Sequence, residues 1–519
     1  MSLHVLLASP EIAPLTGANE IGEQTAALAR GLRERGLTVS IVAPSYGTGA
    51  EQRFGLARRL RKLPVDLGGE PVELEVLQGK LSPSDATVYL LDHPPTFHRE
   101  QHFGPYADDY RRAYLLAAGV VQLVHTLGLK PQVVHAQDWA TGLLPLLLRR
   151  PPAGAPALGD TAVVFTLHDA AQLGLFAPGI LGELRLPGDL YQPDALEFYG
   201  QVSLLKAGLV FADAITVPSP SFAAELQQDG QGAGLHGLYA ARRLRLTGIA
   251  GGIDAQRWAP GQDHSLAMAF DAAELDGKAQ CKEALQQELG LPVHPTHPLL
   301  LVAGPLHQLA GAELVLDAAP RWLSPDGGLS PEVGHELQVV FLGEATGPTM
   351  ERIAQLVTEA PRVVTYRPWG GEELLRRALA GADAIVLPAP SAPNGVLALK
   401  ALRYGAVPLA HAAGGLRDHL VDFDPPSGTG TSVLFDAPTA AALLHGLQRL
   451  LALFADRRRW RRLTQNGMRQ HVGWTTSAAR YERLYRQLLD LPQDRPQSEV
   501  GAEVEAAVGA EVGAGIGLS

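Results

Sequence analysis

The 519-residue sequence is poor in the features that mark several broad classes of protein. It holds a single cysteine, Cys281, which excludes an intrachain disulfide and a zinc site built from cysteines. No apolar run approaches the roughly 20 residues of a membrane-spanning helix, and the N-terminus lacks the basic and apolar regions of a signal peptide. The sequence therefore predicts a soluble protein with a cytoplasmic location.

An excess of positive charge is also missing. Lys and Arg number 43 against 54 Asp and Glu, which gives a formal net charge of -11. Nucleic acids and anionic membranes repel such a surface, so we expect neither as a partner. The 17 histidines show no metal-ligand spacing, and we predict neither a metal site nor another cofactor.

What the chain does contain is a regular series of apolar segments. Hydrophobic residues make up 46% of the chain, enough for a large core, and its length favours two or more domains. Continuous apolar runs predict strands buried on both faces of parallel sheets, and helical patterns such as 20–36 lie between them. This alternation predicts an α/β protein of two Rossmann-like, doubly wound domains facing a central cleft. The predicted strands are 3–9, 38–45, 133–138, 162–169 and 214–219, then 299–304, 337–343, 362–367, 384–390 and 407–412.

Two segments interrupt this alternation. Residues 251–261 separate the two series of strands, so we place the boundary between the domains at about residue 254. The last 28 residues, 492–519, are dominated by Ala, Gly, Val and Glu and lack aromatic anchors. Such a composition predicts a disordered tail.

Six segments carry a recognisable pattern: VVFTLHD (163–169), LEFYGQVSLLKAGLVFADAITVPSPSFAAEL (196–226), ARRLRLTGIAGGID (241–254), GKAQCKEALQQELGLP (277–292), LRYGAVPLAHAAGGLRDHLVDFDP (402–425) and NGMRQHVGW (466–474). In their order and spacing, over roughly residues 3–490, they resemble bacterial glycogen synthases and plant starch synthases. The resemblance implies the GT-B fold, with domains at 1–254 and 255–475 and a crossover helix at 476–491. It also implies transfer of glucose from ADP-glucose to an α-1,4-glucan with retention and without a metal.

The residues at the family's reactive positions depart from this pattern. Breaking the bond between glucose and diphosphate builds negative charge on the leaving group, which fixed cations must stabilise when no metal is present. Pro305 and Ala310 stand where the resemblance implies an Arg and a Lys, and Gly17 stands where it implies a second Lys. Gln137 replaces a His near the transferred sugar, and Ala392 replaces a Glu. Loss of one such group typically lowers the rate of reaction by about 10²–10³-fold. Because these five residues lack the groups that the resemblance implies, we predict that none of them is catalytic.

Other residues keep the chemistry needed to bind a nucleotide or a sugar. Glycines at helix starts leave backbone N–H groups open to a phosphate, and polar side chains at strand ends can contact sugar hydroxyls. Each also has a structural interpretation, because glycines shape turns and polar side chains support cleft walls. The candidates are Asp138, Trp139, His168, Asn394, Gly395, Gly414 and Gly415.

Three functional hypotheses follow. The first is a catalytically impaired member of the family that binds α-1,4-glucan, ADP, ADP-glucose or an active glycogen synthase. The second is an active retaining glucosyltransferase with a rewired site, in which His307, Arg367, Arg417 or Asn394 supplies the missing groups. The third is a scaffold recruited as a sensor of another metabolite.

Overall fold

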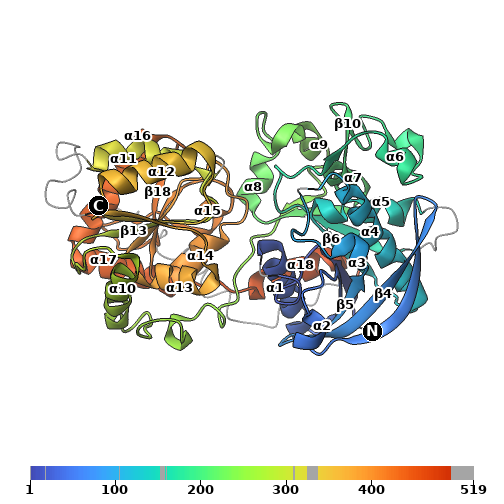
Figure 1. The fold of residues 1–519 in the computed structure, drawn as a ribbon, viewed down its shortest axis with the longest axis horizontal. Coiled ribbons are helices and arrows are strands. Elements are labelled where there is room, and N and C mark those ends of the chain that lie inside the picture. Colours follow the sequence, from blue (N-terminus) through green and yellow to red (C-terminus); the bar gives the residue numbers. More distant parts are fainter. Residues whose placement is uncertain are drawn as a thin grey trace, which may run out of the picture.

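The computed structural model describes residues 2–17, 19–104, 106–151, 158, 160–307, 310–323 and 337–491. The predicted tail at 492–519 and the loop residues Gln308 and Leu309 lie outside the described residues. Two large β-sheets form the centres of two lobes, which lie side by side in Figure 1. We call the part built on the nine-stranded sheet the first lobe and the part built on the six-stranded sheet the second lobe.

The sheet of the first lobe has the order β12-β11-β7-β6-β1-β2-β5-β4-β3. Strand β1 lies in the middle and pairs in parallel with β2 and β6, with Val5 opposite Val39 on one side and Val133 on the other. The strands are β1 (His4–Ala8), β2 (Thr38–Pro44), β3 (Ala57–Leu67), β4 (Glu70–Leu81), β5 (Ala86–Asp92), β6 (Val133–Gln137), β7 (Ala162–Thr166), β11 (Ala214–Val217) and β12 (Leu246–Gly248). A small separate sheet holds β8 (Leu175–Phe176), β9 (Glu197–Phe198) and β10 (Gln201–Ser203).

The sheet of the second lobe is parallel throughout, in the order β15-β14-β13-β16-β17-β18. Every residue of β14 is buried, as expected for a strand covered on both faces. The strands are β13 (Leu299–Ala303), β14 (Gln338–Leu342), β15 (Val364–Arg367), β16 (Ala384–Leu387), β17 (Val407–His411) and β18 (Val433–Phe435).

Helices cover both faces of each sheet, which confirms the predicted doubly wound α/β architecture (Figure 1). The helices of the first lobe are α1 (Glu20–Glu34), α2 (Ala50–Arg53), α3 (Pro94–Phe97), α4 (Asp109–Thr126), α5 (Leu143–Arg149), α6 (Ile180–Glu183), α7 (Leu204–Phe211), α8 (Pro220–Glu225) and α9 (His236–Ala241). Those that follow are α10 (Asp276–Leu289), α11 (Ala312–Leu323), α12 (Gly347–Glu359), α13 (Gly371–Gly381), α14 (Val396–Arg403), α15 (Gly414–His419), α16 (Ala440–Ala455), α17 (Arg457–Met468) and α18 (Thr475–Leu488).

Helix α1 shows how local sequence sets an element that borders the cleft. The side chain of Asn19 accepts the N–H of Gly22 and caps the start of the helix. Leu28 and Leu32 are buried against the core, whereas Ile21 is partly buried. The helix predicted at 20–36 is confirmed.

Helix α18 crosses from the second lobe back to the first and lies beside α1 (Figure 1). The phenol of Tyr485 and Nδ1 of His135 lie 2.8 Å apart in a buried hydrogen bond. A Cβ on Gly31 of α1 would come within 2.6 Å of the Cβ of Ala478, so a larger residue at Gly31 would force the helices apart. These contacts join the end of the described chain to the first sheet, although the boundaries at 254 and 475 stay a prediction.

The edge of the first sheet departs from the sequence-based expectation. Strands β3, β4 and β5 were not predicted, and they extend the parallel core with two antiparallel pairings. Strand β3 reads ARRLRKLPVDL, and its polar side chains are mostly exposed. Because this strand has one solvated face, it lacks the continuous apolar run that identified the others.

Candidate functional site

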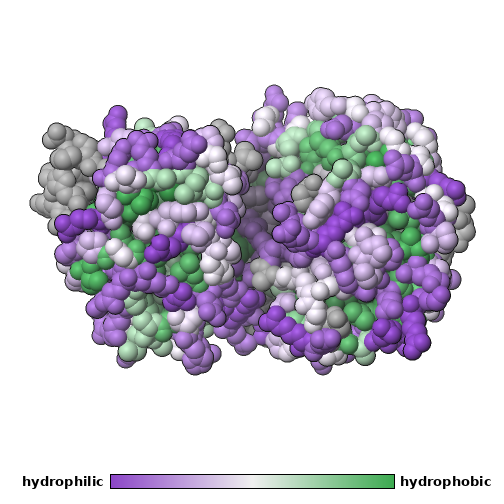
Figure 2. Space-filling model, in the orientation of Figure 1, coloured by the Kyte–Doolittle hydropathy of each residue, from purple (hydrophilic) through white to green (hydrophobic). Residues whose placement is uncertain are grey.

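The topology of the two sheets locates the place where a ligand would bind. In a doubly wound sheet the crevice opens at the point where the strand order reverses. There the chain leaves two neighbouring parallel strands toward opposite edges of the sheet, and the crevice lies outside their carboxyl ends. That point lies between β1 and β6 in the first lobe and between β13 and β16 in the second. Four of the five substituted positions lie in the loops at these ends, and the fifth, Gln137, is the last residue of β6. The four are Gly17, Pro305, Ala310 and Ala392. Figure 2 shows the molecule hollowed between the lobes, with hydrophilic residues around the hollow.

The five substituted positions carry no permanent charge in this crevice. At Gly17 a Cβ would lie 3.2 Å from Cε1 of His102 and 3.3 Å from a carboxylate oxygen of Glu11, so the space beside it is filled. Pro305 is exposed, and the N–H of Ala310 donates to the carbonyl of His307 at 3.1 Å. These residues therefore offer no side-chain cation to a diphosphate.

A cluster of polar side chains lies at the ends of β6 and β7, where Gln137 and Asp138 are buried and His168 is partly buried. Nε2 of His168 and Oε1 of Gln137 are 2.9 Å apart, and Oδ1 of Asp138 accepts the N–H of Trp139 at 2.7 Å. Four further atoms are buried and have no hydrogen-bond partner among the described residues: Nε2 of Gln137, Oδ2 of Asp138, Nδ1 of His168 and the hydroxyl of Tyr239. Sequence reasoning missed Tyr239, because a Tyr in α9 gives no sign that it reaches a strand end more than 100 residues earlier.

Burial also sets the protonation of this cluster. Desolvation raises the pKa of Asp138 to about 8, and nearby Asp169 adds to the rise, against the bond from the N–H of Trp139. Desolvation lowers the pKa of His168 to about 4 and that of His135 to about 3. At neutral pH both imidazoles are therefore uncharged, and the Asp138 carboxyl is largely protonated. The cluster presents neutral donors and acceptors, which suit hydroxyl groups better than an anion.

Trp139 supports the cleft wall. Its side chain is buried, and its ring packs edge-on against Phe103 with centroids 5.7 Å apart. Its indole N–H points to Oε1 of Gln172 at 3.4 Å, and a Cβ on Gly174 would come within 2.5 Å of the ring. The structure thus favours the structural interpretation of Trp139, although its role as a ligand contact stays a prediction.

The candidate glycines of the second lobe lie together, and the N–H groups of Gly414 and Gly415 have protein partners. Gly395 precedes α14 with a φ of 65°, which confirms that it opens a helix. The N–H of Gly414 donates to a carboxylate oxygen of Glu225 at 2.8 Å, and that of Gly415 donates to the carbonyl of Ala392 at 2.7 Å. Asn394 accepts the N–H of Val396 at 3.2 Å. A phosphate at this point would have to displace Glu225.

One cation between the lobes was missed by sequence reasoning. Nζ of Lys400, in α14, lies 2.9 Å from a carboxylate oxygen of Glu23 in α1, and it also sits over the ring of Trp258. Glu20 keeps contact with solvent, yet desolvation raises the pKa of its carboxyl to about 7 while Lys400 opposes the rise. Lys400 resembles a solvated helix residue in the sequence, and only the apposition of the lobes reveals its partner.

The four residues proposed for a rewired site lie around the same sheet. Arg367 ends β15, the edge strand two places away from β13. The guanidinium of Arg417 donates to the carbonyl of Ala412 at 2.6 Å and 3.0 Å. Nδ1 of His307 accepts the N–H of Ala310 at 3.3 Å, and Asn394 caps its own turn. Each therefore has a local structural role or lies at the sheet edge.

The part of the chain that the structure describes holds no group of three or more His, Cys, Asp or Glu side chains that could hold a metal ion. It also holds no helix long and apolar enough to cross a membrane. Cys281 is buried and unpaired by any disulfide.

Comparison with known proteins gives a consistent result. Residues 4–241 match the family model described as the starch synthase catalytic domain. The chain is 38% identical to a glycogen synthase of Anaeromyxobacter sp. (strain Fw109-5) over 492 residues, covering 94% of this chain and 99% of the relative. It is 34% identical to glycogen synthase 2 of Geobacter sulfurreducens over 492 residues, with the same shares of each chain.

A solved structure supports the same fold. The catalytic domain of starch synthase IV from Arabidopsis thaliana, bound to ADP and acarbose, superposes with a TM-score of 0.85 at 25% identity. The match covers 94% of this chain and 100% of that one. The two doubly wound lobes therefore form the GT-B fold that the sequence predicted.

Proposed function

The chain belongs to the glycogen and starch synthase family, and from that premise we propose that it binds α-1,4-glucan without transferring glucose. In this account the chain still recognises sugars, as expected for the family, but does not catalyse transfer. The observation that carries it is the polar cluster at the ends of β6 and β7, where four buried polar atoms have no partner among the described residues. Buried polar groups are nearly always hydrogen-bonded, so such a cluster points to a bound partner.

The chemistry of the cluster suits a sugar ring. Gln137 offers amide donors, His168 offers a ring nitrogen, and the protonated Asp138 and Tyr239 offer hydroxyl groups that both donate and accept. Sugar hydroxyls also donate and accept, so each can pair with either kind of group. His168 is partly exposed, which gives a ligand in the cleft access to the buried members.

The loss of transfer rests on charge. Departure of a nucleoside diphosphate requires cations fixed near the leaving oxygens. Gly17, Pro305 and Ala310 supply none, and the N–H of Gly414 is engaged by Glu225. Without these groups, the chain would bind ADP or ADP-glucose weakly. It would also fail to lower the activation free energy of glucose transfer. An active glycogen synthase as a binding partner and a cytoplasmic location remain sequence-based predictions.

Calorimetric titration with maltoheptaose tests the binding half of the proposal. Wild-type protein should bind, and His168→Ala should weaken binding about tenfold, since one hydrogen bond contributes about 1–1.5 kcal/mol. His125→Ala, an exposed histidine on α4, is the matched control and should leave affinity unchanged. Absence of maltoheptaose binding, or equal loss in both variants, would refute glucan binding at this cluster.

An active enzyme with a rewired site is the second candidate, and Lys400 is the observation that favours it. This cation stands between the lobes and could approach a ligand if Glu23 released it. If Lys400 performs this role, the wild type should turn over ADP-glucose and Lys400→Gln should abolish turnover. We favour the binding function because Lys400 is already paired with a carboxylate.

A further inference from the structure

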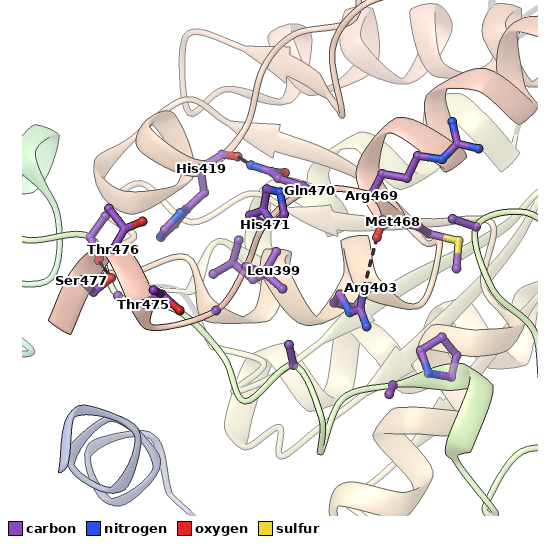
Figure 3. Close-up of a pocket in the computed structure, with 18 of the residues that line it drawn as sticks. Leu399, Arg403, His419, Met468, Arg469, Gln470, His471, Thr475, Thr476 and Ser477 are labelled. Carbon is purple, nitrogen blue, oxygen red and sulfur yellow. Dashed lines mark hydrogen bonds between the residues drawn. The ribbon is translucent and has the colours of Figure 1, made fainter. Parts of the chain in front are cut away.

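A large cavity lies away from the crevice, at the hinge between the lobes. It has a volume of about 1660 Å³ and contains none of the residues predicted to bind a nucleotide or a sugar. Its walls come from both segments that connect the lobes, near Gly251 and Gly473, and from the ends of α14, α15 and α17. Figure 3 shows this hinge cavity, with α14 and the start of α18 along its sides.

Two polar atoms in the wall of the hinge cavity have no partner. Nε2 of His419 and Oε1 of Gln470 are buried and have no hydrogen-bond partner among the described residues. Gln470 is fixed in place because its amide donates to the carbonyl of His419 at 2.8 Å. In Figure 3 the ring of His419 points toward the first turn of α18. Desolvation lowers the pKa of His419, against the opposing effects of Asp418 and of a backbone hydrogen bond to Asn394.

The start of α18 adds donors to the same space. The 14-residue helix has no side-chain cap, and Thr475, Thr476 and Ser477 of its first turn line the cavity. The first backbone N–H groups of a helix lack intrahelical partners and attract anions. Arg480 follows one turn later on the same wall and has no ion-pair partner among the described residues. Arg403 lines the cavity from α14.

The acidic residues of the wall are already engaged. Both carboxylate oxygens of Asp418 accept bonds from Ser221, at 3.0 Å from its N–H and 2.6 Å from its hydroxyl. Asp271 accepts the N–H groups of Ala273 and Glu274 in its own turn. Their charge is therefore partly satisfied within the protein, whereas the guanidinium of Arg480 is not.

We propose that the hinge cavity binds a small phosphate-bearing polyol of the sugar phosphate class. The phosphate would lie against the start of α18 and Arg480, and hydroxyl groups would pair with His419 and Gln470. A glucan chain fits less well, because apart from histidines the one aromatic residue in the described lining is Phe270, which is buried and offers no stacking platform. This site does not depend on the function proposed for the crevice.

Helix α15 connects the hinge cavity with the crevice. This helix meets the cavity at Asp418 and His419, and it meets Glu225 of the first lobe through Gly414 at its other end. A backbone hydrogen bond also ties His419 to Asn394, in the loop after β16. A ligand in the hinge cavity would therefore touch the element that borders the candidate sugar site.

Calorimetric titration of the full chain with fructose 6-phosphate tests the proposal, with fructose and inorganic phosphate titrated separately. We expect fructose 6-phosphate to bind more tightly than inorganic phosphate, and fructose not to bind measurably. Arg480→Gln should weaken binding of fructose 6-phosphate about tenfold. Arg483→Gln, exposed on the same helix but outside the cavity lining, should leave it unchanged.

Several outcomes would overturn this site. Failure of fructose 6-phosphate to bind would do so, as would equal effects of Arg480→Gln and Arg483→Gln on its binding. Loss of binding in His168→Ala would place the ligand in the crevice and would also refute the proposal. Failure of maltoheptaose binding with retained, Arg480-dependent binding of fructose 6-phosphate would refute the function proposed for the crevice and leave this inference standing.

Discussion

The backbone N–H of Gly414 donates to the carboxylate of Glu225 at 2.8 Å, and this bond joins the two lobes. Glu225 ends α8 of the first lobe, and Gly414 begins α15 of the second. The carboxylate thus occupies a helix start that sequence reasoning had assigned to a phosphate. A contact within the chain takes the place expected for a ligand.

Glu225→Ala should loosen the apposition of the lobes. A hydrogen bond to a charged group contributes about 1.5–3 kcal/mol, so its loss would shift an opening equilibrium roughly tenfold or more. Small-angle scattering should show a larger radius of gyration in the variant than in wild type. Asp229→Ala, an exposed acidic residue shortly after α8, is the matched control. Identical scattering from all three proteins would show that the Glu225 bond does not hold the lobes together.

Asp138 should make stability fall as pH rises. Its folded pKa of about 8 lies far above its ordinary value of 3.8, so the folded state keeps a proton that the unfolded chain releases. This contribution is complete below about pH 4 and is lost as pH rises through 8. Asp138→Asn removes it and should raise the free energy of unfolding at pH 8 by at least about 1 kcal/mol.

Urea unfolding at pH 5 and pH 8 measures this effect. Asn tolerates the positive φ of 61° at position 138, and it can still accept the N–H of Trp139. Asp85, which is exposed and shares a φ of 61°, supplies the control variant Asp85→Asn. If Asp138→Asn raises the free energy of unfolding at pH 8 no more than Asp85→Asn does, the raised pKa of Asp138 would be contradicted.

His135 should act in the opposite direction on the acid side. Burial lowers its pKa to about 3 in the folded state, whereas its ordinary pKa is 6.5. Between these two pH values the unfolded chain binds a proton at His135 and the folded state does not. Stability from this group is present above pH 6.5 and is lost as pH falls toward 3. His135→Gln should flatten the pH dependence of urea unfolding between pH 4 and 6.5, whereas the exposed His125→Gln should not. Parallel curves for the two variants would argue against the buried, neutral imidazole.

Restoring the missing charges of the second lobe should not restore transfer. Pro305→Arg with Ala310→Lys returns two cations to the loop after β13, but Gly17, Gln137 and Ala392 remain unchanged. Because groups that act together in a transition state contribute non-additively, two of five should yield little turnover. Incorporation of labelled glucose from ADP-glucose by the double variant measures this. Substantial turnover would show that the loop alone had silenced the enzyme.

Most strands of the parallel cores could be predicted from sequence, although the three-residue edge strands β12 and β18 were not predicted. The contacts between the lobes could not be predicted. Strands such as β1, β6, β13 and β16 are buried on both faces, so their continuous apolar runs identify them. The antiparallel edge was not predicted, because one face of β3 is exposed to solvent and the strand therefore lacks a continuous apolar run.

The candidate site shows the same division. Asp138 and His168 were predicted because they lie at the ends of predicted strands, where ligands bind in such folds. Gln137 was identified through the resemblance to the family, as the replacement of a His. Tyr239, Glu225 and Lys400 were missed, since each reaches the site from a helix whose approach depends on tertiary packing. The pairing of Gly414 with Glu225 spans 189 positions in the chain, and no local pattern encodes it.

Transfer of labelled glucose from ADP-glucose to a maltoheptaose or glycogen primer tests the central claim most directly. The purified full chain should bind the primer and yet incorporate no label above a protein-free control, because the leaving diphosphate meets no fixed cation at positions 17, 305 and 310. Incorporation at a rate comparable to that of an active glycogen synthase measured alongside would contradict the account.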